Sequence, residues 1–140
     1  MTKLFVATCF LVFVGIQASP SEPGSTGQTT VSYCTNVGPV EITIRGDSAT
    51  GRYLLTVTPE LKKGILKGTY SKGLFEGTWN DPDGVGRIII GFNPDHTRFL
   101  AMYNTSKDAS HWYNEWKGVS KDYYPQLKAE EKKGLVCDWK

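Results

Sequence analysis

Short stretches in which apolar and polar residues alternate recur along most of the chain. The stretch 40–45, VEITIR, alternates without a break. Further stretches of this kind, less strict in their alternation, cover 53–57, 65–70, 74–79, 87–92, 98–103 and 111–117. Side chains of a β-strand point to opposite faces in turn, so this period predicts seven strands. Segments rich in Gly, Pro, Asn and Asp lie between the stretches and predict short turns.

Strands that follow one another through short turns pair with their sequence neighbours, and closing such a meander removes its exposed edges. One segment departs from the alternation. The run 124–133, YPQLKAEEKK, consists of helix formers after Pro125, and Gly134 follows where helices commonly end. The sequence therefore predicts an all-β fold: an antiparallel meander of about seven strands forming a small barrel or barrel-like sheet, with a short C-terminal helix.

The stretch 66–79, LKGTYSKGLFEGTW, twice contains Gly-Thr followed by an aromatic residue. In a hairpin with a two-residue turn at 72–73, three pairs face one another: Tyr70 with Phe75, Gly68 with Gly77, and Leu66 with Trp79. These six residues share one face, on which glycines separate bulky groups, and the other face is polar. A small closed sheet alternates small and large residues in its interior. We therefore interpret the repeat as a packing rule, in which glycines make room for bulky neighbours, and not as a ligand-binding signature.

This arrangement is similar to the glycine- and tryptophan-containing strands of avidin and lipocalin-type barrels. The resemblance is confined to the strand pattern of 66–79 and does not include the motif with which either family begins. It therefore assigns no family and carries no binding residue over to this chain.

The chain divides into a leader, a tail and one domain. Residues 1–18 have the layout of a secretory signal peptide, with Lys3 before the apolar run 4–16 and small residues after it. That run is shorter than the about 20 residues of a spanning helix, and no second one follows, so we expect no membrane span in the mature chain. The segment 19–30 is rich in Ser, Pro, Gly and Thr and predicts a flexible polar tail. A single β domain is expected over 31–140, in a secreted, extracellular protein.

Two of the three cysteines remain once Cys9 leaves with the predicted signal peptide. Cys34 and Cys137 lie near the two ends of the remaining chain. In an oxidising compartment an even count favours pairing, so we predict a disulfide between them.

Charge and motifs argue against several functional classes. Of the 16 basic residues Lys3 leaves with the predicted leader, so 15 remain against 14 acidic residues, which gives no drive toward nucleic acid. Motifs of serine hydrolases, zinc proteases, redox dithiols and phosphate loops are absent. The run 80–84, NDPDG, lacks the later Glu of a calcium loop and is explained by turn chemistry. We expect a non-enzymatic protein with no cofactor and no metal site.

Aromatic residues supply the main candidate site for a ligand. In 111–116, HWYNEW, alternation places Trp112, Asn114 and Trp116 on one face. With Trp79 and Tyr103 they form a set that suits stacking on a sugar ring or a small apolar ligand, and that equally suits the filling of a barrel interior.

Two further motifs are characteristic of extracellular proteins. Arg45, Gly46 and Asp47 resemble the adhesion sequence recognised by integrins, although Gly-Asp also favours a turn without any function. Asn104-Thr105-Ser106 is an N-glycosylation sequon in a predicted surface loop.

These features favour a secreted, non-catalytic structural component of a matrix, mucus or shell, with other matrix components as partners. The alternative is a barrel that binds a glycan or a small apolar ligand through the aromatic set. A third, weaker hypothesis is cell adhesion through Arg45, Gly46 and Asp47.

Overall fold

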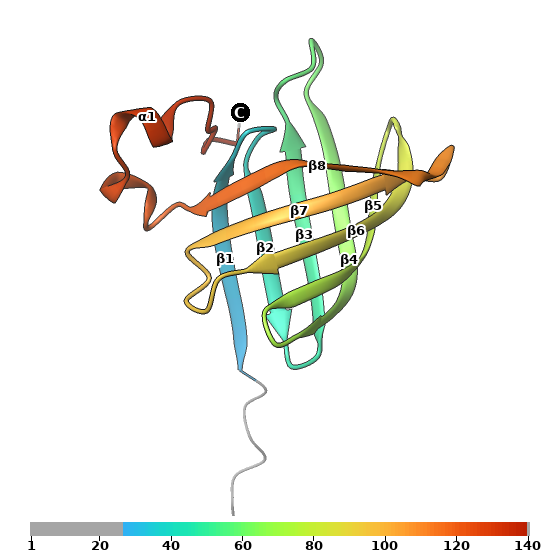
Figure 1. Ribbon diagram of the computed structural model, residues 1–140, viewed down its shortest axis with the longest axis horizontal. Coiled ribbons are helices and arrows are strands. Elements are labelled where there is room, and N and C mark those ends of the chain that lie inside the picture. Colours follow the sequence, from blue (N-terminus) through green and yellow to red (C-terminus); the bar gives the residue numbers. More distant parts are fainter. Residues whose placement is uncertain (1–26, 140) are drawn as a thin grey trace, which may run out of the picture.

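Eight antiparallel strands follow one another in the computed structural model, which describes residues 27–139. Each strand pairs with its sequence neighbours, and β1 and β8 pair to close a barrel (Figure 1). The strands are β1 Gln28–Thr35, β2 Val40–Arg45, β3 Ser48–Leu55, β4 Lys62–Ser71, β5 Leu74–Asp81, β6 Gly84–Phe92, β7 Arg98–Thr105 and β8 Asp108–Ser120. The predicted all-β meander barrel is confirmed, with one strand more than the seven expected.

The additional strand is β1. It begins at Gln28, inside the segment 19–30 that we predicted as a tail, and its first residues pair with β2. Thr30 and Thr43 of the two strands are joined through their hydroxyls at 2.9 Å. Exposed, polar residues fill this start of the strand, so the sequence shows no apolar period there. The predicted signal peptide 1–18 lies outside the described residues.

The β4–β5 hairpin has the register predicted from its sequence. The facing pairs are Leu66 with Trp79, Gly68 with Gly77, and Tyr70 with Phe75. The two turn residues, Lys72 and Gly73, both have positive φ, of 50° and 79°, as a two-residue type I′ turn requires. The glycine-aromatic repeat is therefore a packing rule of two facing strands.

The same rule recurs around the barrel, where an inward aromatic ring lies over a glycine of the next strand. The cross-strand pairs are Tyr53 with Gly64, Trp79 with Gly86, and Phe99 with Gly118. A Cβ added to any of these glycines would come within 2.6 Å of the ring that it faces. Glycines thus make the room that large rings need inside a narrow barrel.

One end of the barrel is filled by aromatic rings. There the β6–β7 turn folds inward, and the His96 ring packs edge-on against Tyr70 and Phe92. The hydroxyl of Tyr33 donates to the carbonyl of His96 at 2.9 Å. Phe99 packs edge-on against Tyr33, with ring centroids 4.9 Å apart. Buried aliphatic residues of β2, β4 and β6 fill the middle of the barrel.

The barrel closes through a short seam between its first and last strands. The β1–β8 pairing consists of Tyr33 with Ser120, Cys34 with Val119, and Thr35 with Gly118. The side chain of Asn36 extends the seam, because its amide donates to the Glu115 carbonyl at 2.7 Å and accepts from Lys117 N–H at 2.9 Å.

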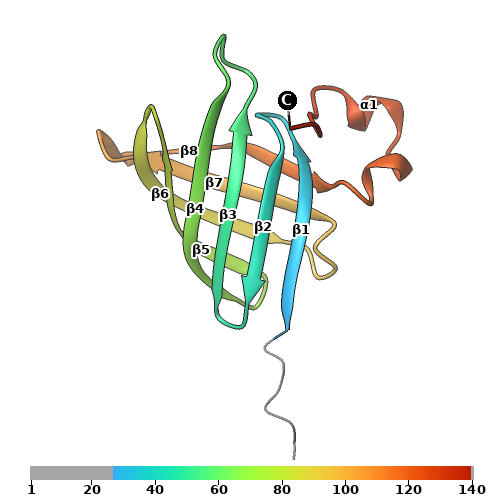
Figure 2. The ribbon, with the colours of Figure 1, turned by 180° about the vertical axis from the view of Figure 1, so that it is seen from behind.

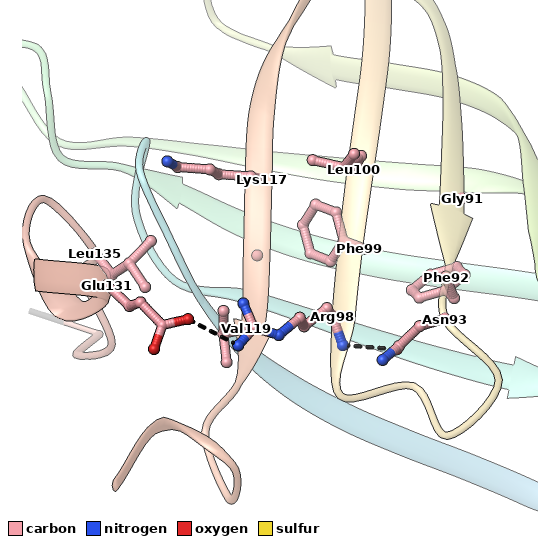
Figure 3. A pocket seen from close by; sticks show the side chains of 11 residues that line it. Gly91, Phe92, Asn93, Arg98, Phe99, Leu100, Lys117, Val119, Glu131 and Leu135 are labelled. Carbon is pink, nitrogen blue, oxygen red and sulfur yellow. Dashed lines mark hydrogen bonds and ion pairs between the residues drawn. The ribbon is translucent and has the colours of Figure 1, made fainter. Parts of the chain in front are cut away.

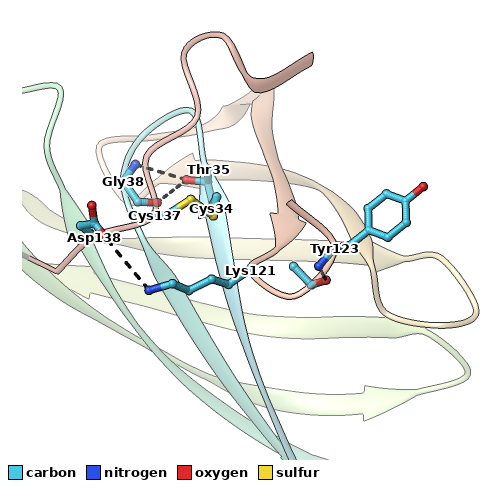
Figure 4. The surroundings of a disulfide bond; sticks show 8 residues. Cys34, Thr35, Gly38, Lys121, Tyr123, Cys137 and Asp138 are labelled. Atoms are coloured by element: carbon cyan, nitrogen blue, oxygen red, sulfur yellow. Dashed lines mark hydrogen bonds and ion pairs between the residues drawn. A yellow bond between two sulfur atoms is a disulfide. The ribbon is translucent and has the colours of Figure 1, made fainter. Parts of the chain in front are cut away.

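The C-terminal segment loops out to the side of β1 and returns to the end of that strand (Figure 2). It contains a 3-10 turn, Tyr124–Gln126, and the helix α1, Ala129–Lys132, which confirms the predicted short helix. The segment then returns to β1, where Val136 and Thr35 exchange two backbone hydrogen bonds. Next to them Cys137 forms the predicted disulfide with the fully buried Cys34 (Figure 4). Across the described residues 27–139, no helix has the length and apolar character that crossing a membrane demands.

Candidate ligand pocket at the mouth of the barrel

The end of the barrel opposite His96 is open and holds a pocket of about 180 Å³. Four of its wall residues are aromatic, and two carboxylates stand at the β5–β6 turn. The lining residues are Val37, Tyr53, Leu55, Trp79, Asp81, Asp83, Tyr103 and Trp116. They come from the β1–β2 turn and from β3, β5, β7 and β8, so the pocket exists only once the barrel is closed.

The aromatic walls of the pocket stand nearly at right angles to one another. The Trp79 and Tyr103 ring planes meet at 86°, and those of Tyr103 and Trp116 at 89°, with centroids 6.2 Å apart in both pairs. Tyr53 stands against Trp116 at 75° with centroids 5.3 Å apart. Such edge-to-face packing holds the rings in fixed positions and presents their faces toward different directions.

Hydrogen bonds engage the polar atoms of three of these rings. Trp79 Nε1 donates to the Asn104 carbonyl at 2.7 Å, and Trp116 Nε1 donates to Thr35 Oγ1 at 3.0 Å. The Tyr53 hydroxyl donates to Asp81 Oδ2 at 2.7 Å. Burial and this hydrogen bond raise the pKa of Tyr53 well above its usual value, so the phenol keeps its proton and remains the donor. The rings are therefore rigid and lack spare N–H donors.

The two carboxylates of the pocket differ in how their charge is balanced. Asp83 accepts from Lys62 Nζ at 2.7 and 2.8 Å, which forms an ion pair. Asp81 accepts from two neutral groups, the Tyr53 hydroxyl and the Asp83 N–H at 2.8 Å. Burial raises the pKa of Tyr103, and the nearby carboxylates of Glu115 and Asp81 raise it further. Of the two carboxylates, Asp83 therefore has a cation in direct contact and Asp81 does not.

Three of the five predicted ligand residues meet in this pocket, and two do not. Trp79, Tyr103 and Trp116 line it. Trp112 lies outside, where the guanidinium of the exposed Arg87 stands 5.8 Å from its ring centre. Asn114 is exposed.

A register shift between β7 and β8 separates the predicted residues. Ala101 pairs with Trp116, but Tyr103 pairs with Tyr113, so the β8 strand carries one extra residue between the two pairs. Such a bulge reverses the inward and outward positions beyond it. The expectation that Trp112, Asn114 and Trp116 share one face is therefore wrong, and Tyr113 stacks on Tyr103 at the rim instead.

Sequence reasoning missed the remaining members of the pocket. Tyr53 belongs to a predicted strand but has no aromatic neighbour in sequence to draw attention to it. Asp81 and Asp83 were explained as turn residues, and they do form the turn, where Asp81 accepts from a backbone N–H. A hint was present, since Asp81 ends the strand that carries Trp79 inward and Asp83 follows in the turn.

The adhesion-like tripeptide occupies the tip of the β2–β3 hairpin. Gly46 has a φ of 58°, which a type II′ turn needs at its first central position. Arg45 and Asp47 are both exposed, and Arg45 Nε donates to the Gln28 side chain at 2.6 Å. Exposure of both charges is what adhesion requires, and the turn itself explains the glycine. Adhesion stays a prediction.

The sequon asparagine does not lie in a surface loop as predicted. Asn104 belongs to β7 and only 3% of it is exposed. Its Oδ1 accepts from Arg87 N–H at 2.9 Å, and its Nδ2 donates to the Ala109 carbonyl at 2.9 Å. The side chain thus bridges β6 to the β7–β8 hairpin in the folded protein. Glycosylation itself stays a prediction.

Replacement of Asn104 by alanine is expected to lower the free energy of unfolding by about 3 kcal/mol, because it empties a buried position and leaves two partly buried backbone groups without partners. Urea unfolding measures the loss. Ser106→Ala is the matched control, since it removes the sequon, keeps Asn104 and alters an exposed side chain. We expect that control to stay within about 0.5 kcal/mol of the parent. An equal loss in both variants would assign the effect to an attached glycan.

A larger hollow of about 530 Å³ lies on the outside of the barrel, between the sheet and the C-terminal segment (Figure 3). Arg98 and Glu131 form an ion pair across it at 3.1 Å. Its walls include Leu100, which is 68% exposed, and Leu135. Arg98 and Glu131 are already paired with one another, and the walls are open to solvent, so we take the mouth pocket as the candidate site.

Within the described residues 27–139, His, Cys, Asp and Glu do not gather in groups of three or more that could hold a metal ion. The polar groups of the mouth are instead two carboxylates among rings, an arrangement suited to binding an organic molecule. No protein-family model, curated protein or solved structure matches the chain.

Proposed function

We propose that the protein is an extracellular, non-catalytic binder that holds a small organic ligand in the mouth of its barrel. The single observation that carries the proposal is the contrast between the two ends. Rings fill the end around His96, whereas rigid rings surround a pocket of about 180 Å³ at the other. An apolar cavity of about 150 Å³ in another protein binds benzene, so this volume suits a compact ligand.

The proposed extracellular location rests on features near the two ends of the chain. The predicted leader and the Cys34–Cys137 disulfide together support an extracellular location, since such bonds persist in oxidising compartments. A matrix, mucus or shell role stays a prediction from the sequence. The mouth pocket favours the ligand-binding alternative over it.

Tryptophan fluorescence tests ligand binding directly. The panel consists of compounds of benzene size and slightly larger, with methyl glycosides included. A bound compound is expected to change the emission of the parent and of Trp112→Phe, and to change that of Trp116→Phe less, because Trp79 is then the one tryptophan left in the pocket wall. Trp112 is the matched control, because it lies on the outer face.

Melting of the same samples supplies a second readout, because a ligand at a hundred times its dissociation constant adds about 2.7 kcal/mol of stability. Leu55→Phe is expected to fill part of the pocket and to abolish the stabilisation, since Leu55 lines the mouth. Val57→Phe, at a site that is 64% exposed, is expected to retain it. A shift that persists in Leu55→Phe would place the site elsewhere and refute the proposal.

A further inference from the structure

One carboxylate of the mouth pocket forms no ion pair within the described residues 27–139. Asp83 is paired with Lys62, whereas the hydrogen bonds of Asp81 come from a phenol and a backbone N–H. Asp81 is half-buried and lines the pocket. A carboxylate accepts several hydrogen bonds and is most stable beside a positive charge. Lys62 acts on Asp81 through space while its Nζ contacts Asp83, so no cation of the described residues 27–139 contacts Asp81 directly.

The walls of the pocket attract positive charge as well. Aromatic faces carry negative potential, and ammonium groups bind to cages of such rings. Trp79, Tyr103 and Trp116 stand at right angles around one volume, so a group at its centre meets more than one ring. Tryptophan is the strongest of the aromatic residues in this interaction.

Most hydrogen-bond donors on the lining side chains are already engaged, and the Tyr103 hydroxyl is the exception. The indole N–H groups of Trp79 and Trp116 and the hydroxyl of Tyr53 are spent on protein acceptors. An anion would find rings and carboxylates without N–H groups to hold it. A sugar needs donors as well as acceptors for its hydroxyls. An ammonium ion brings donors of its own.

From these observations we infer the chemical class of the ligand: a compact organic cation. Its apolar body lies among Tyr53, Trp79, Tyr103 and Trp116, and its ammonium group points toward Asp81. This inference rests on the proposed function, since it names the ligand class of the same pocket. Binding is reversible and involves no covalent step.

Three probes of similar shape and different charge test the inference by calorimetry. Benzylammonium is expected to bind about tenfold more tightly than benzyl alcohol, because it adds a cation–π contact and a charge-assisted hydrogen bond. Benzoate is expected not to bind. Asp81→Asn is expected to reduce the affinity for benzylammonium to that for benzyl alcohol. The affinity for benzyl alcohol itself is expected to change less than twofold. Asp122→Asn, at an exposed carboxylate beyond β8, is the matched control.

A second variant tests the charge in the opposite direction. Lys62→Gln removes the cation that balances Asp83. It is expected to raise the affinity for benzylammonium about threefold, because the cationic probe no longer meets the repulsion of Lys62. The affinity for benzyl alcohol is expected to stay unchanged. A gain of this kind cannot result from partial unfolding, so it keeps the test decisive where Asp81→Asn folds poorly.

The outcomes distinguish a failure of the cation preference from a failure of the proposed function. Equal affinities for benzylammonium and benzyl alcohol would overturn the cation preference and leave the proposed function standing. Loss of both probes to the same extent in Asp81→Asn, with no gain in Lys62→Gln, would also overturn it. Failure of all three probes to bind the parent at millimolar concentration would overturn the inference and the proposed function together.

Discussion

Replacement of Cys34 and Cys137 together by alanine is expected to lower the free energy of unfolding by about 4–5 kcal/mol. The disulfide closes a loop with a sequence separation of 103 residues, and in the chain-entropy model a crosslink of about 100 residues contributes about 4.7 kcal/mol. Cys34 is fully buried beneath the C-terminal segment, so truncation of its side chain adds a small packing loss.

Urea unfolding of the oxidised parent and of the double variant measures this loss. The chemically reduced parent is the control, because it lacks the crosslink and keeps both sulfur atoms. We expect the reduced parent to lose nearly as much stability as the double variant. A loss below about 1 kcal/mol in both would show that the seam and the C-terminal segment hold the barrel closed without the disulfide.

Gly68→Ala is expected to destabilise the barrel by about 3 kcal/mol or to prevent folding, which lies at the upper end of the effects of overpacking. A Cβ on Gly68 would lie 2.2 Å from the Glu76 carbonyl oxygen and 2.7 Å from the Gly77 Cα. Both atoms belong to the backbone, so no side chain can rotate away to relieve the contact. The two facing strands would have to separate.

Gly91→Ala is the matched control for this substitution. Gly91 also lies within a strand, β6, but the nearest atom to an added Cβ is the Leu100 carbonyl oxygen at 3.9 Å. We expect the free energy of unfolding of this variant to stay unchanged or to rise by up to about 1 kcal/mol, because alanine lowers the conformational entropy of the unfolded chain. Thermal or urea unfolding of the pair gives the comparison. Equal stability of Gly68→Ala and Gly91→Ala would contradict the packing rule.

The features predicted correctly from sequence are those that local alternation determines. The β4–β5 hairpin was predicted with its register, because an error of one residue would have moved Leu66 and Trp79 to the polar face. The disulfide followed from the count of two cysteines in an oxidising compartment. The general architecture followed from short strands joined by short turns.

The features missed are those that depend on residues far apart in sequence. The bulge in β8 arises from pairing with β7, and nothing in HWYNEW marks where it falls. Asn104 is buried because its amide joins Arg87 to Ala109, a bridge that its sequence neighbours do not reveal. The charge balance at the mouth likewise depends on an ion pair between Lys62 of β4 and Asp83 of the β5–β6 turn. Sequence patterns therefore predicted the scaffold better than the site.

The shortness of the β1–β8 seam has a consequence for how the barrel opens. Three residue pairs close it, against eight pairs between β3 and β4. Protein structures open in cooperative units whose free energies follow the density of buried contacts and backbone pairing. We expect amide protons of the seam to exchange with solvent well before those of β3 and β4, and reduction of the disulfide to widen that difference. The crosslink then acts as a latch on the strand pair with the fewest paired residues, where the cylinder unrolls into a sheet most easily.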